Sequence, residues 1–256
     1  MDNVTLCFDF GNTRLKCGLF IIDQLSEVLT LEDDSIASIK LLLDKYNPEN
    51  TILSSVINHN VEIEKLLSQR TSFLKLDSST KLPFTTPVPK PETIGADRLA
   101  LAASAVYFYK GKNNLVIALG SCITYNFINK YNSFIGGSIS PGMEMRFKSL
   151  HAFTAKLPLL NSESIPAAWN FPLIGYDTNT NILSGVILGM AAEIDGIINR
   201  YKEKFNDCNV ILTGGDTGSF EGHLQNSNFA DPWLILKGLY AINKYNRDFK
   251  KSQIES

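Results

Sequence analysis

The sequence predicts an α/β protein made of two similar halves, and two observations lead to this prediction. In residues 4–109, apolar runs of strand length alternate with segments that have helical periodicity. The same pattern restarts near residue 115 and continues toward the C-terminus. A chain of 256 residues accommodates two domains, which we place at residues 1–112 and 113–256.

The first half opens with a strand, a tight turn and a second strand. Apolar runs at 4–10 and 15–22 flank Gly11-Asn12-Thr13, and Gly-Asn supplies the positive-φ positions that such a turn needs. The elements expected after this unit are a strand near 27–31, a helix over 35–46, a strand at 51–57, a helix at 61–67, a strand at 73–76, a proline-rich loop at 83–91 and a helix from 98 to about 109.

The second half opens in the same way, with a strand at 115–119, the small-residue turn Gly120-Ser121 and a strand at 123–128. The elements expected after it are a strand at 134–140, a helix at 143–153, an irregular stretch at 156–176, a helix at 181–205, a strand at 210–213, a helix at 232–245 and a frayed polar tail. The similar openings favour a duplication, with a chance similarity between two α/β units as the alternative.

The composition limits the partners of the protein. With 24 basic and 26 acidic side chains the formal charge is −2, so no broad positive field attracts nucleic acid or an anionic membrane. We read no segment as approaching the ~20 apolar residues of a membrane span. The start, Met1-Asp2-Asn3, lacks a secretory leader. We therefore expect a cytoplasmic protein without a nucleic-acid or membrane partner, whose phosphate site is built locally.

The cysteines and histidines do not have the spacing of a metal site. No two of the cysteines have C-x-x-C spacing, which favours buried free thiols over a disulfide or zinc site; they are Cys7, Cys17, Cys122 and Cys208. The three histidines are far apart in the sequence: His59, His151 and His223. A histidine–metal hydrolase is therefore not expected.

The first candidate site is Asp9-x-Gly-Asn-Thr-x-x-Lys16. The turn Gly11-Asn12-Thr13 directs successive N–H groups and a hydroxyl toward one point, which suits phosphate oxygens. Asp9 would repel phosphate unless a cation lies between them, and Mg²⁺ binds carboxylate and phosphate oxygens together. From these eight residues alone, an ordinary β-hairpin is the slightly favoured interpretation.

The second candidate site is Gly95-Ala96-Asp97-Arg98, where a helix begins. Asp97 has a structural interpretation as the N-cap of that helix, although no Glu or Gln follows three residues later to complete a capping box. In the functional interpretation, Asp97 accepts a hydroxyl proton while Arg98 holds an anion. From these four residues alone, the N-cap interpretation is favoured.

Two glycine pairs indicate places where the backbone lies close to a bulky neighbouring group. They are Gly136-Gly137 in a strand and Gly214-Gly215 after a strand, the latter suited to a flat nucleobase. Simple turn chemistry is the alternative for both pairs. The P-loop and Rossmann phosphate-binding sequences are both absent.

Together and in this order, these motifs resemble the type III pantothenate kinases of bacteria over nearly the whole chain. The motifs that carry the resemblance are Asp9-x-Gly-Asn-Thr-x-x-Lys16, Pro91-Glu92-Thr93-x-Gly95-x-Asp97-Arg98, Gly136-Gly137-x-Ile139-x-Pro141-Gly142, 154–158, Ser184-Gly185 with Gly189, Thr213-Gly214-Gly215 and 236–239. The resemblance implies two duplicated ribonuclease-H-like (actin-like ATPase) domains, with mixed sheets flanked by helices, that hold ATP between them.

The resemblance also implies the chemistry. It implies phosphorylation of pantothenate to 4′-phosphopantothenate, at the entry to coenzyme A, by a homodimer that uses ATP, Mg²⁺ and a monovalent cation (K⁺ or NH₄⁺). Asp97 would be the catalytic base, and the substrate would be held by Gly95, Arg98 and, from the partner subunit, Thr178. ATP and its phosphates would be held by Asp9, Gly11, Asn12, Thr13, Lys16, Gly120, Ser121, Thr124, Gly214 and Gly215, with Asp9 also as the metal ligand.

The sequence departs from the family pattern in the second turn. Ala118 stands where the family has an aspartate, and Ser121 stands where it has threonine. Asn126 replaces a frequent Asp, Asp177 replaces a common Asn, and Phe84 is the candidate for a tyrosine position. The alternatives to an active kinase are a catalytically weak or inactive family member that acts as a binding or regulatory protein, and a different small-molecule kinase of the same superfamily.

Overall fold

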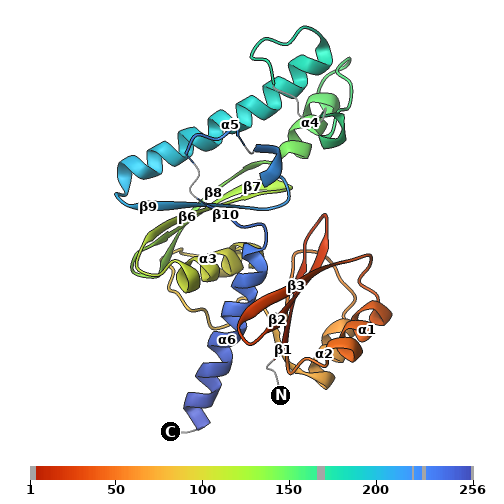
Figure 1. Ribbon diagram of the computed structural model, residues 1–256, viewed down its shortest axis with the longest axis vertical. Coiled ribbons are helices and arrows are strands. Elements are labelled where there is room, and N and C mark those ends of the chain that lie inside the picture. The colour runs from red at the N-terminus through yellow and green to blue at the C-terminus, as the bar shows by residue number, and fades with distance from the viewer. Residues whose placement is uncertain (1–3, 166–170, 221, 227–228, 255–256) are drawn as a thin grey trace. The chain divides into compact units, whose positions relative to one another are not determined.

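The computed structural model describes residues 4–165, 171–220, 222–226 and 229–254, and within them it confirms the α/β class (Figure 1). The strands are β1 (Val4–Phe10), β2 (Leu15–Ile21), β3 (Gln24–Leu31), β4 (Asn50–Ser55), β5 (Ser72–Lys75), β6 (Asn113–Leu119), β7 (Cys122–Asn129), β8 (Ser133–Pro141), β9 (Cys208–Thr213) and β10 (Phe229–Ala230). The α-helices are α1 (Ile36–Tyr46), α2 (Glu62–Arg70), α3 (Ala96–Phe108), α4 (Met143–Ala152), α5 (Thr178–Lys204) and α6 (Leu234–Ile254).

The strands form two five-stranded sheets with the same order. The first sheet runs β3-β2-β1-β4-β5 and the second runs β8-β7-β6-β9-β10. β1 pairs antiparallel with β2 and parallel with β4, and β6 pairs parallel with β9. The predicted mixed sheets are therefore confirmed, and Asp9 in β1 and Ala118 in β6 occupy equivalent positions.

The described residues divide into two compact units. Unit 1 comprises those of Met1–Gly111, Ile128–Gly136 and Trp233–Ser256, and unit 2 comprises those of Lys112–Phe127 and Gly137–Pro232. The predicted domains, 1–112 and 113–256, remain a prediction. The compact units differ from them in that unit 1 also contains the described residues of Ile128–Gly136 and Trp233–Ser256, and so includes α6.

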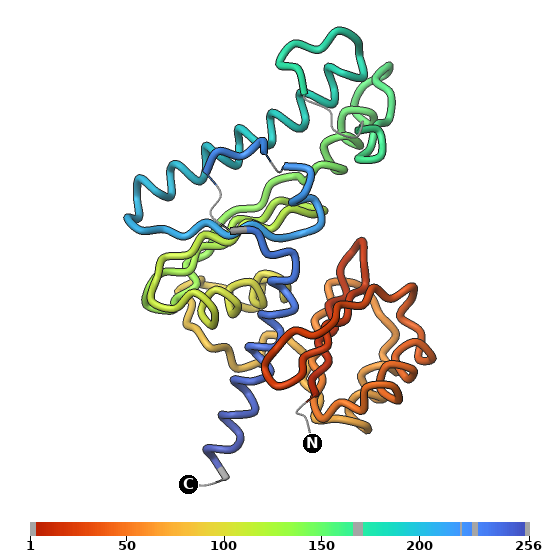
Figure 2. Tube along the Cα trace, in the orientation of Figure 1, coloured from red at the N-terminus to blue at the C-terminus, as the bar shows by residue number. Residues whose placement is uncertain are grey.

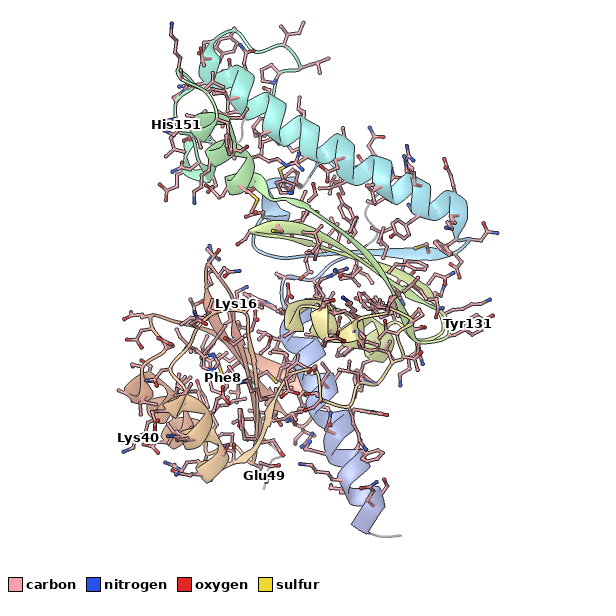
Figure 3. All side chains as sticks on the ribbon, turned by 180° about the vertical axis from the view of Figure 1, so that it is seen from behind. Phe8, Lys16, Lys40, Glu49, Tyr131 and His151 are labelled. Atoms are coloured by element: carbon pink, nitrogen blue, oxygen red, sulfur yellow. The ribbon has the colours of Figure 1, made fainter. Side chains whose placement is uncertain are left out.

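In unit 1, the sheet has helices on both faces. The side chains of β1 alternate between the faces, and Phe8 and Phe10 pack on α1 and α2 with both rings fully buried. Figure 3 shows Phe8 among the side chains of this layer. Asp9 therefore points to the other face, where α6 contacts β1 and β4 and packs along α3.

In unit 2, α5 supplies much of the core, with Ile187, Met190 and Ile194 packed with side chains of β6. Contrary to our expectation for the chain, the length and hydropathy of α5 are sufficient to cross a membrane. Half of that apolar stretch is buried inside the protein, as in a core helix. Asp177 caps α5 by accepting from the Thr180 N–H at 2.7 Å, so the helix begins three residues before the predicted start.

The prediction of a frayed tail after residue 245 is wrong, because α6 continues to Ile254 (Figure 2). The polar residues of this stretch have partners in unit 1. Asn246 donates to the backbone oxygen of Lys81, whose ammonium lies 3.3 Å from the centroid of the Phe249 ring. Tertiary contacts of this kind stabilise a helix that its own sequence does not strongly favour.

Candidate active site

The first predicted turn lies between β1 and β2, in unit 1. The Gly11 N–H donates to the Arg14 oxygen at 3.2 Å, which closes the turn, and Asn12 and Thr13 are exposed at its tip. In the strands that flank it, Asp9 lies directly opposite Lys16. Figure 3 labels Lys16 on β2. The local pairing that the sequence predicts therefore places a carboxylate and an ammonium beside an exposed turn.

The charges around Asp9 are arranged as in a cation and phosphate site. Burial raises the pKa of Asp9 to about 6, the Lys16 ammonium opposes that rise, and the Asp97 carboxylate adds to it. Burial also lowers the pKa of Lys16, while Asp9 raises it. Asp9, Lys16 and Asp97 thus share one electrostatic environment, although Asp97 is distant in the sequence.

Asp97 is not the N-cap of α3, so the structural interpretation is wrong. The N-cap is Gly95, and Asp97 is the second residue of the helix. A Cβ on Gly95 would collide with Asp97 Oδ1, so the carboxylate folds back over the glycine. The absence of a side chain at residue 95 therefore leaves room for the carboxylate in this position.

Arg98 lies against an aromatic pair. Its guanidinium carbon is 5.6 Å from the centroid of the Phe134 ring, and Phe134 packs edge-on with Phe84 at 6.2 Å. Such stacking restricts the orientation of the guanidinium. Phe84, the candidate for the family tyrosine, therefore belongs to the group that orients Arg98.

The second predicted turn, Gly120-Ser121 in unit 2, is surrounded by backbone. Gly142 donates from its N–H to the Ser121 oxygen at 3.2 Å, and a Cβ on Gly142 would overlap the Gly120 oxygen. Gly214 has φ +103°, and a Cβ there would overlap the Leu119 oxygen. A Cβ on Gly215, in contrast, would face open space. Two separate glycines are thus required by close contact with this turn.

Replacing Gly214 with alanine is expected to destabilise the protein by about 1–3 kcal/mol, because the new methyl group meets both a positive φ and the Leu119 oxygen. Gly215→Ala is the matched control, since its methyl group meets no atom. Urea denaturation of the two variants measures the difference. Equal stabilities would show that the contact at residue 214 is unimportant.

The remaining predicted residues of unit 2 lie in different surroundings. Thr124 is mostly buried in β7, and its hydroxyl accepts from the Asn126 amide at 3.0 Å. Thr178 is exposed at the start of α5 and lines a groove of about 650 Å³ between α4 and α5. Thr178 therefore lies on a different element from Thr124 and from the turn Gly120-Ser121, and only Thr124 among these residues is buried.

The metal-ligand set in unit 1 fits Mg²⁺. Ala118, at the position equivalent to Asp9, supplies no ligand, and the described residues contain no group of three His, Cys, Asp or Glu side chains that could hold a metal. Mg²⁺ commonly takes one or two carboxylates and completes its shell with phosphate oxygens and water. The desolvated Asp9 carboxylate near Asp97 provides the anionic surroundings that such an ion needs.

Sequence reasoning missed a partly buried ion pair in unit 2. Arg146 of α4 donates to Glu193 of α5 at 2.5 Å and to the Ser140 hydroxyl at 3.1 Å, and the Tyr125 hydroxyl donates to Glu193 at 3.1 Å. Burial raises the pKa of Glu193, but its hydrogen bonds from Arg146 and Ser140 outweigh this and hold it below the usual range. No motif spacing links these residues, so nothing in the sequence identified the group.

Two mixed sheets of the same strand order, each with a glycine turn after its first strand, define the actin-like ATPase fold. Solved structures agree: a Campylobacter jejuni protein assigned to the Baf family of transcriptional activators is 20% identical with a TM-score of 0.60, covering 95% of this chain and 99% of its own. Glucokinase from an Antarctic psychrotroph is 10% identical with a TM-score of 0.52, at the same coverage. These likenesses show the fold.

Within this class, the chain belongs to the type III pantothenate kinase family. The model of that family matches residues 5–200. The type III pantothenate kinase of Christiangramia forsetii is 41% identical over 246 residues, or 95% of this chain and 99% of the relative. That of Bacteroides fragilis (strain YCH46) is 40% identical over 247 residues, or 95% and 98%. The family predicted from the motifs is confirmed.

Proposed function

We propose that this protein transfers the γ-phosphoryl group of ATP to the primary hydroxyl of pantothenate, which gives 4′-phosphopantothenate at the start of coenzyme A biosynthesis. The observation that carries the proposal is the shared electrostatic environment of Asp9, Lys16 and Asp97. Membership of the family supports the identity of the two substrates. A base, a phosphate-binding cation and a metal-binding carboxylate are what phosphoryl transfer requires.

In this reaction the substrate oxygen forms a bond to the γ-phosphorus, and the bond from that phosphorus to the β–γ bridging oxygen breaks. Asp97 orients the hydroxyl and accepts its proton, and ADP leaves. Arg98, oriented by Phe134, holds the anionic substrate with Gly95, while Lys16 draws the phosphates toward the exposed turn Gly11-Asn12-Thr13. The protein contributes mainly alignment and charge neutralisation.

The remaining ligands are assigned by the family pattern. Asp9 holds Mg²⁺, which when bound with ATP neutralises phosphate charge. In unit 2, ATP is held by Gly120, Ser121, Thr124, Gly214 and Gly215. A monovalent cation, K⁺ or NH₄⁺, is part of the proposal and is tested by replacing it with Na⁺ in the assay. A cytoplasmic location, without a nucleic-acid or membrane partner, agrees with the near-neutral charge.

The test is a coupled ATP assay with pantothenate, Mg²⁺ and K⁺ or NH₄⁺. Turnover dependent on pantothenate is expected for the wild type. If the protein binds ATP and pantothenate but does not turn over, it is the binding or regulatory protein of the alternative. Turnover with another small alcohol alone would identify a different kinase of the superfamily.

Replacing Ala118 with aspartate is expected to lower the Mg²⁺ concentration for half-maximal activity by about 10–100-fold, because it restores the carboxylate of the family pattern. Ala118→Asn is the matched control, since it adds the same volume without charge. The measurement is a Mg²⁺ titration of both variants and the wild type. An equal effect of Asn and Asp would show that charge at residue 118 does not act on the metal.

We also propose a homodimer in which Thr178 reaches the substrate of the partner subunit. The segment that leads to Thr178 exposes large apolar side chains, which a monomer rarely leaves in contact with water. They are Phe153, Leu159, Leu173, Ile174 and Tyr176, and four of these are more than three-quarters exposed. The segment also adjoins the groove between α4 and α5, which Thr178 lines.

The double substitution Leu173→Glu and Ile174→Glu is expected to convert the dimer to a monomer, because each new carboxylate would be buried at an apolar interface in the dimer. Leu41→Glu in α1 is the matched control, because Leu41 is similarly exposed in unit 1. Sedimentation equilibrium measures the mass. A wild-type monomer, or a dimer unaffected by the double substitution, would contradict the assignment of this surface.

A further inference from the structure

The start of α6 contacts the strand that carries Lys16. Trp233 immediately precedes the helix, and the Lys16 ammonium lies 5.4 Å from the centroid of the Trp233 ring. A cation over an indole face is attracted by the ring, and more so where water is partly excluded. Burial lowers the pKa of Lys16, so this ammonium is partly desolvated. Trp233 therefore restricts where the ammonium can lie.

One turn further along α6, Leu236 packs on the backbone of β2. A Cβ on Gly18 would lie 3.2 Å from Leu236 Cδ1, closer than almost all real contacts. Gly18 is two residues from Lys16 and so lies on the same face of β2. Leu236 is fully buried. The distance between β2 and α6 is therefore set by direct contact.

The opposite side of α6 contacts the helix that carries Asp97. A Cβ on Gly238 would overlap the backbone oxygen of Ala100 in α3. Ala100 is three residues after Asp97, about one turn along the helix. The two helix backbones touch here without an intervening side chain, so the separation of α3 and α6 is also set by direct contact.

A third contact prevents α6 from simply moving aside. The Tyr240 ring stacks on Phe20 of β2, with centroids 4.3 Å apart and planes 13° apart. Its hydroxyl donates to Asp23 in the β2–β3 turn, and Lys244 also donates to Asp23. An increase in bulk at residue 238 would therefore displace α3 rather than α6 alone.

We propose that Trp233, Leu236 and Gly238 are positioning residues, through which α6 fixes the separation of Lys16 on β2 and Asp97 on α3. The inference rests on the proposed phosphoryl transfer, in which Lys16 holds phosphate and Asp97 orients the hydroxyl. An error of about 1 Å in such an alignment can cost on the order of 100-fold in rate. The three residues act through Lys16 and Asp97, which makes them positioning rather than catalytic.

The proposal predicts different kinetic effects for Trp233, which lies against Lys16, and for Gly238, which contacts α3. Trp233→Leu is expected to weaken ATP binding about fivefold to tenfold through Lys16, with Trp233→Phe restoring most of the loss. Gly238→Ala is expected to lower kcat about 10–100-fold through Asp97, with the KM for ATP changed less than threefold. Leu42→Ala, in the core with α1 and away from α6, is the control for stability alone.

The experiment measures kcat, KM and melting temperature for the full-length variants, with Kd for a non-hydrolysable ATP analogue. It also follows Trp233 fluorescence during ATP binding in a Trp169→Phe background, which needs no turnover and is expected to change as Lys16 engages phosphate. This readout separates a failure of the positioning role from a failure of the proposed reaction.

Unchanged ATP affinity in Trp233→Leu, together with silent Trp233 fluorescence, would overturn the proposal. A loss of kcat in Leu42→Ala as large as that in Gly238→Ala would also overturn it, because a general loss of stability would then explain both. If Gly238→Ala does not fold, the proposal is tested by the ATP affinities of Trp233→Leu and Trp233→Phe and by the Trp233 fluorescence.

Discussion

Replacing Asp97 with alanine is expected to lower kcat for pantothenate phosphorylation by about 10²–10⁴-fold, while the melting temperature changes little. The loss of rate is that of a positioned base, because Asp97 folds back over Gly95 at the start of α3. The stability is preserved because Gly95, and not Asp97, is the N-cap. The expected loss of stability is that of the interaction between the Asp97 carboxylate and the helix dipole, about 0.3–1 kcal/mol.

Two further variants separate the charge of Asp97 from its shape. Asp97→Asn keeps the volume but cannot accept a proton, so its kcat is expected to fall nearly as far as that of Asp97→Ala. Glu62→Ala removes an acid from the first turn of α2, so it reports the dipole effect away from the site. Steady-state kinetics and thermal unfolding measure both properties. A fully active Asp97→Asn variant would contradict the assignment of the base.

The strand–turn–strand openings were predictable because their chemistry is local. An antiparallel hairpin places Asp9 opposite Lys16 whatever else the chain does. The sequence alignment of the two openings also placed Ala118 at the position of Asp9, and the equal strand order of the two sheets supports that equivalence. Local pairing and repetition were therefore enough to predict the Asp9–Lys16 pair and the equivalence of residues 9 and 118.

The four residues around Asp97 favour the N-cap interpretation, which the structure contradicts. An aspartate at the N-cap and one at the second helical position differ by the backbone angles of a neighbouring glycine, which no residue pattern encodes. Gly95 adopts φ −57° and ψ 142°, which makes it the cap. The proximity of Asp97 to Asp9 likewise depends on packing between distant segments, so only the structure could place both in one electrostatic environment.

The role of α6 was the largest gap. The polar residues after Tyr245 predicted fraying, but their contacts with Lys81 extend the helix. Gly238 belongs to one of the motifs that resemble the family, but the sequence does not explain why glycine is needed there. The close approach of Gly238 to the Ala100 oxygen explains it. Contacts of this kind join residues that are far apart in the sequence, so hydrophobic periodicity detects the helix but not what lies on each side of it.

Replacing Asp9 with asparagine is expected to change activity and stability in opposite directions. The activity is expected to fall at least about 100-fold, because in the proposed function Asp9 binds the metal directly and a direct ligand matters more than a residue that acts through water. The unliganded protein is expected to become more stable at neutral pH. The reason is that folding buries Asp9 and places it near Asp97, which raises its pKa from 3.8 to about 6.

The sign of the pH dependence follows from that shift. Between pH 4 and pH 6 the folded protein binds the Asp9 proton more tightly than the unfolded chain, so this contribution to stability is lost as the pH rises. Above pH 6 the ionised carboxylate costs as much as about 3 kcal/mol. Asp9→Asn removes the cost, so the stability gain over wild type is expected at pH 7.5 and not at pH 4.

Urea denaturation at these two pH values, without nucleotide or metal, measures the effect. Asp33→Asn is the control of opposite sign, because hydrogen bonds from Ser38 and Ser35 lower the pKa of Asp33 and its loss should not stabilise the protein at pH 7.5. ATP with Mg²⁺ is expected to stabilise the wild type more than Asp9→Asn, since only the wild type keeps the ligand. A less stable Asp9→Asn variant at pH 7.5 would contradict the prediction, because it would mean that the carboxylate contributes favourably to folding even without its cation.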